Sequence, residues 1–131
     1  MRISTRLHGL LDYAAALSLG GLAASGALSG RSRDVAVVAT AVPVAAFLAT
    51  DHEAGLVRWV DMRDHLRFDV AWGALLFGTA VLALRREPPA SRTVLAFYGL
   101  SQLVLGLATD PRPERRPGQG PGPVSRLLGR A

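Results

Sequence analysis

Two histidine–aspartate pairs recur in the chain with the same internal spacing. His8 is followed four residues later by Asp12, and His65 is followed four residues later by Asp69. Residues four apart lie on one face of a helix, where a carboxylate can accept a hydrogen bond from an imidazole N–H. Such pairs can join helices through hydrogen bonds, hold a hard or borderline divalent cation, or relay protons or ions.

A second repeated motif adds more polar groups. The letters Leu-Ala-Thr-Asp occur at residues 48–51 and again at 107–110. Together the two motifs define a candidate polar cluster, which consists of His8, Asp12, Asp51, His65, Asp69 and Asp110. His52 and Glu53 directly follow the first Leu-Ala-Thr-Asp motif and extend the set of groups expected to converge.

The spacing of these residues matches no established catalytic or metal-binding motif. It is neither His-Glu-x-x-His nor the Glu-x-x-His of di-iron bundles. The chain has no Cys and no Lys, which excludes disulfides, cysteine-ligated metals and Schiff-base chemistry. Ser25 and Ser101 lack the flanking residues of a nucleophile elbow. We therefore predict that the protein is not an enzyme, and we assign no catalytic residue, metal ligand or cofactor.

Four uncharged runs must position the polar groups. They cover residues 13–30, 35–50, 70–84 and 93–109. A soluble amphipathic helix carries charges on its solvent face at every turn or so, and these runs carry none. We predict an all-α, polytopic membrane protein with four transmembrane helices, the first of which starts near residue 7. A hydrophobic soluble bundle and, for the first run, a cleaved signal peptide are the alternatives.

The lengths of the connections predict two tandem helical hairpins. The short links at residues 31–34 and 85–92 make the helices on either side antiparallel neighbours. An internal repeat agrees, because the shift along the chain that superposes His8 on His65 also superposes Leu19 on Leu76. The repeats cover about residues 7–51 and 64–110 of a transmembrane domain at 1–110. Since the odd helices start where the even helices end, the candidate cluster is expected at one membrane face.

Three local features complete the predicted fold. Ser32 and Ser91 are expected to cap the second and fourth helices. The connection at residues 51–64 contains Trp59 among charged and apolar residues, which predicts a short interfacial helix. Small residues at 16, 20 and 24, and at 74 and 78, are expected to let helices approach closely.

Parts of the chain resemble the SPW-repeat family of small integral membrane proteins. The matching text is RISTRLHGLLDY at residues 2–13, TDHEAGLVR at 50–58, and the second His-x-x-x-Asp. Each repeat of that family is a pair of transmembrane helices, and the resemblance covers about residues 2–110. The Ser-Pro-Trp tripeptide itself is missing, since residues 25–27 read SGA and residues 82–84 read LAL. The resemblance implies a fold and a membrane location, and it implies no activity.

The charge distribution predicts the orientation. Ten of the fifteen Arg residues lie on the side of the candidate cluster or in the C-terminal tail, and the other five are Arg31, Arg33, Arg85, Arg86 and Arg92. Because cytoplasmic segments of membrane proteins carry the excess of basic residues, both termini are expected in the cytoplasm. We predict a multi-pass protein of the cell membrane.

The last part of the chain has a different composition. Residues 111–131 contain five of the eight Pro residues and five Arg against one Glu, within a net charge of +5 for the whole chain. We predict a disordered, basic, Pro/Gly-rich tail that meets anionic lipid headgroups. The expected partners are therefore the lipid bilayer and these headgroups, with further copies of the chain as an open alternative and no nucleic acid.

These observations favour a structural or interaction role. In this interpretation, His–Asp and Thr–Asp hydrogen bonds join the two repeats at the cytoplasmic ends of the helices. The alternative is a divalent metal-binding protein, or a proton or ion relay, that uses the same residues. A relay has only Gln102 and Ser18 as further polar groups near the middle of a helix.

Overall fold

The chain folds into four helices, as the uncharged runs predict. A computed structural model describes residues 2–51, 55–112 and 127. The helices are α1 (Thr5–Ala24), α2 (Gly30–Leu48), α3 (Met62–Gly78) and α4 (Pro89–Ala108), and α3 continues into a π-helical turn (Thr79–Ala83). Within this described part there is no strand, and two single β-bridges are the only β-type pairing. The all-α prediction is confirmed.

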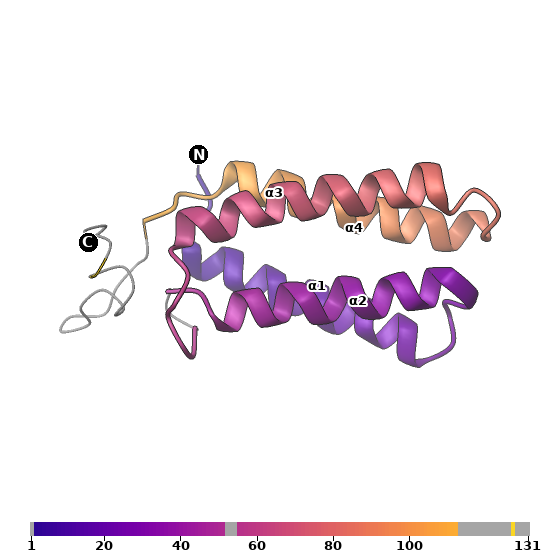
Figure 1. Ribbon diagram of the computed structural model, residues 1–131, viewed down its shortest axis with the longest axis horizontal. Coiled ribbons are helices and arrows are strands. Elements are labelled where there is room, and N and C mark those ends of the chain that lie inside the picture. Colours follow the sequence, from indigo (N-terminus) through magenta and orange to yellow (C-terminus); the bar gives the residue numbers. More distant parts are fainter. Residues whose placement is uncertain (1, 52–54, 113–126, 128–131) are drawn as a thin grey trace.

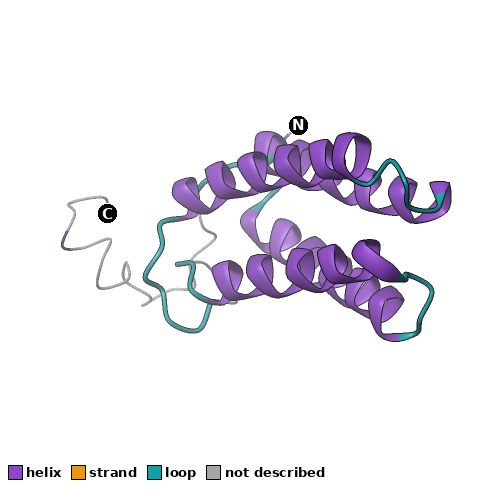
Figure 2. Cartoon of the chain, turned by 45° about the vertical axis from the view of Figure 1, so that its right-hand side comes forward, coloured by secondary structure: helices purple, strands orange, loops and turns teal. Residues whose placement is uncertain are grey.

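The helices form two antiparallel hairpins, α1–α2 and α3–α4, which lie along one another (Figures 1 and 2). The two tight connections lie at one end of the molecule. The starts of α1 and α3 and the ends of α2 and α4 lie at the other end (Figure 1). This is the end where the sequence repeat places the candidate polar cluster.

Equivalent residues start the two odd helices. The side chain of Ser4 accepts a hydrogen bond from the amide of Leu7 at α1, and the side chain of Asp61 accepts one from the amide of Arg63 at α3. Ser4 and Asp61 both lie four residues before the histidine of their helix, so the repeat includes the N-caps.

The predicted caps of the even helices are wrong. The N-cap of α2 is Ser29, and α4 starts with Pro89, so Ser32 and Ser91 are buried inside the first turns. Proline suits a first helical position because the missing N–H has no partner within the helix there. The helices therefore start a few residues before the end of the charged links.

The predicted interfacial helix is also wrong for the described residues 55–60. These residues fold back on the end of α2, where the carbonyl of Leu48 accepts from the amides of Leu56 and Val57. Arg58 has a φ of 56°, in the left-handed region that interrupts a right-handed helix. Residues 52–54 lie outside the described part of the chain.

The segment that precedes each odd helix pairs with the end of the even helix of the other repeat. Ile3 pairs with the end of α4, and Val60 pairs with the end of α2. The hydrogen bonds are Ile3 N to Ala108 O (3.0 Å), Asp110 N to Ile3 O (2.9 Å), Val60 N to Ala49 O (2.9 Å) and Asp51 N to Val60 O (2.7 Å). The two sets of bonds are equivalent under the repeat, so the backbone at this end has an approximate twofold relation.

Two of the four helices are long and apolar enough to cross a membrane. They are Thr5–Ala24 and the continuous helix Met62–Ala83. Only 22% and 28% of their most apolar windows are buried, whereas the core helix of a soluble protein is mostly buried. By the same criterion of length and hydropathy, α2 and α4 are not candidate membrane spans. Charged residues open α2, and α4 contains Arg92 and Gln102.

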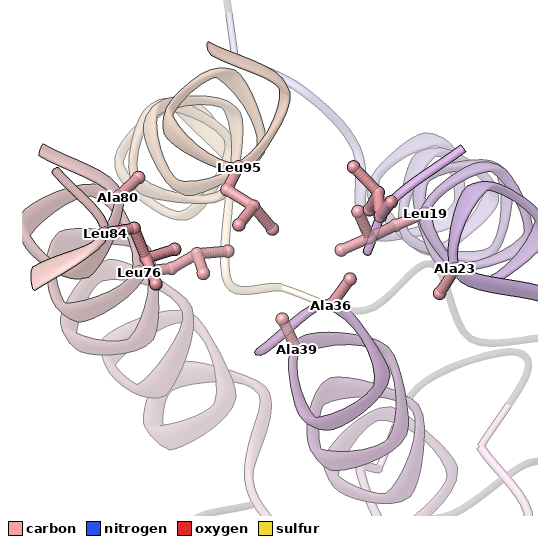
Figure 3. Close-up of a cluster of buried hydrophobic side chains, with 9 residues drawn as sticks. Leu19, Ala23, Ala36, Ala39, Leu76, Ala80, Leu84 and Leu95 are labelled. Carbon is pink, nitrogen blue, oxygen red and sulfur yellow. The ribbon is translucent and has the colours of Figure 1, made fainter. Parts of the chain in front are cut away.

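A buried apolar core lies in the half of the molecule next to the tight connections. Side chains from all four helices contribute to it (Figure 3). Its members are Leu19, Ala23, Leu28, Ala36, Ala39, Leu76, Ala80, Leu84 and Leu95. The hairpins are joined beside this core by Tyr98, whose hydroxyl donates to the carbonyl of Ala15 (2.7 Å). The core holds one half of the molecule together, and the polar cluster lies in the other half.

Glycines bring α3 and α4 into backbone contact. A Cβ atom at Gly73 would lie 2.5 Å from the carbonyl oxygen of Gly99, and one at Gly106 would lie 2.9 Å from that of Leu66. The predicted stripe at residues 74 and 78 is not the contact, because a Cβ at Gly78 would meet nothing within 4 Å. The close approach thus uses a different face of α3 from the one predicted.

Candidate functional site

Four of the six predicted cluster residues come together between α1 and α3. His8 and Asp12 lie on α1, and His65 and Asp69 lie on α3. Each offers one potential ligand atom, and these atoms all lie within 4.8 Å of one another. We call this group the His/Asp cluster. All four residues are at least nine-tenths buried.

Each histidine contacts carboxylates from both helices. His8 Nε2 lies 3.1 Å from Asp12 Oδ2 on its own helix and 3.1 Å from Asp69 Oδ2 on α3. His65 Nε2 lies 3.3 Å from Asp69 Oδ2 and 3.5 Å from Asp12 Oδ2 on α1. The two Nε2 atoms and the two Oδ2 atoms thus alternate around a common centre, and the arrangement links the two hairpins.

Two threonines orient the imidazole rings from outside. His8 Nδ1 lies 2.9 Å from Thr109 Oγ1, and His65 Nδ1 lies 3.1 Å from Thr50 Oγ1. Each threonine hydroxyl donates its own proton to the carbonyl four residues earlier in its helix, at 2.7 Å. Because a hydroxyl has one proton, both threonines accept from the histidines, and Nδ1 carries the proton in both rings. The predicted Thr–Asp hydrogen bonds are therefore Thr–His hydrogen bonds.

Aromatic groups enclose the cluster. The ring of Phe47 lies 5.8 Å from that of His65, and it makes an edge contact with Tyr13 at 4.7 Å. The two imidazoles meet edge to face at 5.7 Å. Phe47 is 2% exposed, so the cluster is separated from solvent on this side. Electrostatic interactions are stronger in such a low-dielectric environment, and unpaired polar atoms are more costly.

A small cavity adjoins the cluster in the middle of the bundle. Its volume is about 20 Å³, which is enough for one water molecule. Three buried polar atoms without a hydrogen-bond partner among the described residues belong to side chains that line it: Asp12 Oδ1, Trp72 Nε1 and Gln102 Oε1. Of the two predicted mid-helix polar groups, Gln102 lines this cavity. Ser18 instead donates to the carbonyl of Ala14 on the outer face of α1.

Asp51 and Asp110 lie at the same end of the molecule, but their side chains are not part of the His/Asp cluster. Asp51 Oδ1 is 4.0 Å from Arg58 Nε, and Asp110 Oδ1 accepts from the amide of Arg112 at 3.0 Å. Both residues follow the last helical residue, where the chain pairs with another backbone segment. The threonine before each of them points to the cluster instead. His52 and Glu53 lie outside the described residues.

The sequence predicts the wrong partner for the two threonines and does not indicate the enclosing phenylalanine. Thr50 and Thr109 belong to the repeated Leu-Ala-Thr-Asp motif, but the prediction pairs them with aspartates, whereas the structure pairs them with histidines. Phe47 has no counterpart in the second repeat, because Gly106 occupies the equivalent position before the second motif. No repeat could therefore have indicated it.

Comparison with known proteins adds no assignment: no protein-family model, curated protein or solved structure matches the chain. The chemistry of the site therefore rests on its own geometry. Two imidazoles and two carboxylates in a buried group can hold protons or a cation, and they can join the helices that carry them.

Proposed function

We propose that the chain is a small integral membrane protein of SPW-repeat type, in which the His/Asp cluster joins two membrane-crossing hairpins in a structural or interaction role. One observation carries the joining role: His8 and His65 each contact carboxylates from both α1 and α3. Without these contacts, each hairpin would leave an ionisable pair exposed on its inner face.

The distribution of apolar side chains supports the membrane location. Large apolar residues are exposed on all four helices, including α2 and α4, which are not among the two candidate membrane spans. They are Leu7, Leu10 and Leu17 on α1, Val37, Val38 and Val42 on α2, Leu75 and Phe77 on α3, and Phe97, Leu100, Val104 and Leu107 on α4. Soluble monomers rarely expose apolar surface on this scale. The polar groups are inside, as expected for a protein surrounded by lipid.

Cysteine labelling tests the four-span topology with cytoplasmic termini. The native chain has no cysteine, so single substitutions report one position each. We expect Arg86→Cys to react with an impermeant maleimide in intact cells, and Arg63→Cys to react only after the membrane is opened. Labelling of Arg86→Cys from the cytoplasmic side alone, or recovery of the chain in the soluble fraction, would contradict the proposal.

A double-mutant cycle tests the joining role. His8→Gln and Asp69→Asn remove two groups that lie 3.1 Å apart on different hairpins. We expect a coupling free energy of about 0.5 to 3 kcal/mol in detergent unfolding, as for other residues in contact. Asp64 and Arg67 form an exposed pair within α3 at 2.9 Å and provide the control, with an expected coupling of less than about 1 kcal/mol. Equal coupling in both cycles would contradict the joining role.

The second candidate is a proton relay, for which the cavity would supply part of a polar path. Polar atoms continue from Asp12 to Gln102. In the described part of the chain, the apolar core then separates Gln102 from Ser32, which lies at the other end of the molecule. A relay needs a continuous polar path, so we expect no proton flux above that of protein-free liposomes. Flux that Asp12→Asn and Asp69→Asn both suppress would establish the relay instead.

A further inference from the structure

We infer that the His/Asp cluster is the binding site of one divalent transition-metal ion of the zinc type. The ligand atoms are His8 Nε2, His65 Nε2, Asp12 Oδ2 and Asp69 Oδ2. The inference deepens the proposed function and rests on it, because in that proposal the cluster joins the two hairpins. The metal would bind two ligands from α1 and two from α3.

When the two imidazoles are neutral, their contacts with the threonines direct a lone pair of each ring into the cluster. Thr109 and Thr50 accept hydrogen bonds from the two Nδ1–H groups, which leaves each neutral imidazole with an unprotonated Nε2. In metal sites, a group outside the ligands commonly holds the other imidazole nitrogen in this way and so fixes the ring orientation. Both histidines thus have the arrangement of metal-ligating residues, and the two threonines have the supporting role.

The contacts of His65 do not have hydrogen-bond geometry. Its Nε2 lies 3.3 and 3.5 Å from carboxylate oxygens, yet in the part of the chain that the structure describes this buried atom has no partner with hydrogen-bond geometry. An N–H group that paired with one carboxylate would point at that oxygen. A lone pair that binds a metal points instead at a centre between the ligands. His65 Nε2 lies at comparable distances from the oxygens of two carboxylates, which is compatible with the second arrangement.

The charge of the cluster also requires a cation. Two carboxylates and two neutral imidazoles carry a charge of −2 in a buried site, and such a charge is stable only with a compensating partner. Two protons on the imidazoles, or one divalent cation, would balance it. Protonation gives His8 a hydrogen bond from Nε2 to Asp69 at 3.1 Å, whereas the Nε2 of His65 has only the longer contacts of 3.3 and 3.5 Å. A single divalent cation satisfies both rings.

The nitrogen–oxygen distances agree with a small four-coordinate ion. Ligand atoms about 2.0 to 2.1 Å from a tetrahedral zinc ion lie about 3.3 Å from each other. The four nitrogen–oxygen distances in the cluster are between 3.1 and 3.5 Å. Two imidazole donors argue against magnesium and calcium, which prefer oxygen ligands throughout. Four protein ligands in a buried position are typical of a structural rather than a catalytic site.

Metal analysis of the full-length chain tests the inference. The protein is purified in detergent with a tag that contains no histidine, from cells grown with zinc. We expect close to one zinc per chain. After removal of zinc by a chelator, Co²⁺ should produce the visible absorption bands of four-coordinate cobalt, which should reach their maximum at one equivalent. X-ray absorption of the zinc protein should show four nitrogen or oxygen ligands at about 2.0 Å and imidazole scattering.

Two substitutions of the same type on α3 make the test specific. Asp69→Asn removes a ligand, and we expect it to weaken Co²⁺ binding by more than about 100-fold. This loss is larger than the loss expected from changing a residue that only supports a ligand. Asp64→Asn changes an exposed aspartate on the same helix, and we expect unchanged affinity. Circular dichroism tests whether both variants are folded. Since the measurements on the unmodified protein do not depend on either variant, an unfolded Asp69→Asn protein leaves the test intact.

The outcomes separate the metal site from the proposed function. Folded protein that contains no zinc and binds no Co²⁺ would overturn the metal site, as would six-coordinate spectra or equal losses in Asp69→Asn and Asp64→Asn. The topology and coupling measurements can succeed in that case, because two protonated histidines could still join the hairpins. Conversely, one zinc per chain in a protein recovered outside the membrane would support the site and refute the membrane location.

Discussion

The two hairpins contribute equally to the His/Asp cluster and differ in how their helices pack. Each hairpin supplies one His, one Asp and one Thr at equivalent positions of the repeat. In α3–α4, however, glycines at residues 73, 99 and 106 bring the two backbones together. In α1–α2 the equivalent positions carry side chains. The comparison shows that the cluster depends on the ends of the helices, while the packing along them can diverge.

The divergence is specific at two positions of the even helices. Where α4 has Gly99 and Gly106, α2 has Thr40 and Phe47 at the equivalent positions of the repeat. Thr40 donates to the carbonyl of its own helix and keeps α1 at side-chain distance, so a Cβ at Gly20 would lie 3.3 Å from its methyl group. Phe47 packs on Tyr13 and His65. The first hairpin thus exchanges close backbone contact for an aromatic cover over the cluster.

The largest expected effect tests whether the two hairpins contribute equally to the His/Asp cluster. Asp12→Asn and Asp69→Asn each remove one buried carboxylate and leave the other charges of the cluster unbalanced. We expect each to reduce the free energy of unfolding by about 3 to 5 kcal/mol, measured by titration with denaturing detergent. Asp64→Asn, on the exposed face of α3, should change it by less than about 0.5 kcal/mol. A large cost for only one of the two cluster variants would show that the hairpins do not contribute equally.

An intermediate effect tests the difference in helix packing between the two hairpins. A Cβ at Gly99 would lie 2.5 Å from the amide nitrogen of Phe77, so Gly99→Ala must push α3 and α4 apart. We expect a loss of about 1 to 3 kcal/mol in the same detergent titration. Gly78→Ala and Gly21→Ala are matched controls, since a Cβ there meets nothing within 4 Å and alanine favours the helix. If all three variants were equally stable, α3–α4 would not depend on backbone contact.

Much of this arrangement could be predicted from the sequence. The four uncharged runs correspond to the four helices of the structure. The internal repeat predicts that His8 and Asp12 lie at the same end of the molecule as His65 and Asp69. Both predictions depend only on periodicity and chain direction, which the sequence specifies.

Other features depend on how the helices are placed against each other. Gly73 rather than Gly78 contacts α4, and the difference is a rotation of α3 that no spacing within α3 reveals. Asp51 and Asp110 leave the cluster because α2 and α4 end before them and the chain becomes extended at Thr109. If α2 and α4 continued by one more turn, the side chains of Asp51 and Asp110 would point in other directions. The partners of the side chains thus depend on helix ends, which are the least certain part of a sequence-based prediction.

The smallest expected effect compares the two threonines, which occupy equivalent positions of the repeat but differ in the side chains around them. Thr50→Val and Thr109→Val each remove the acceptor of a buried Nδ1–H, at a cost of about 0.5 to 1.5 kcal/mol. The cost should be greater for Thr109→Val. Phe47 still packs on the ring of His65 when Thr50 is changed, whereas α4 has Gly106, which has no side chain, at the equivalent position of the repeat. Detergent unfolding of both variants measures the difference. Thr50→Ser and Thr109→Ser, which keep the hydroxyl, should restore most of the loss, and a greater cost for Thr50→Val would mean that the aromatic cover does not hold His65.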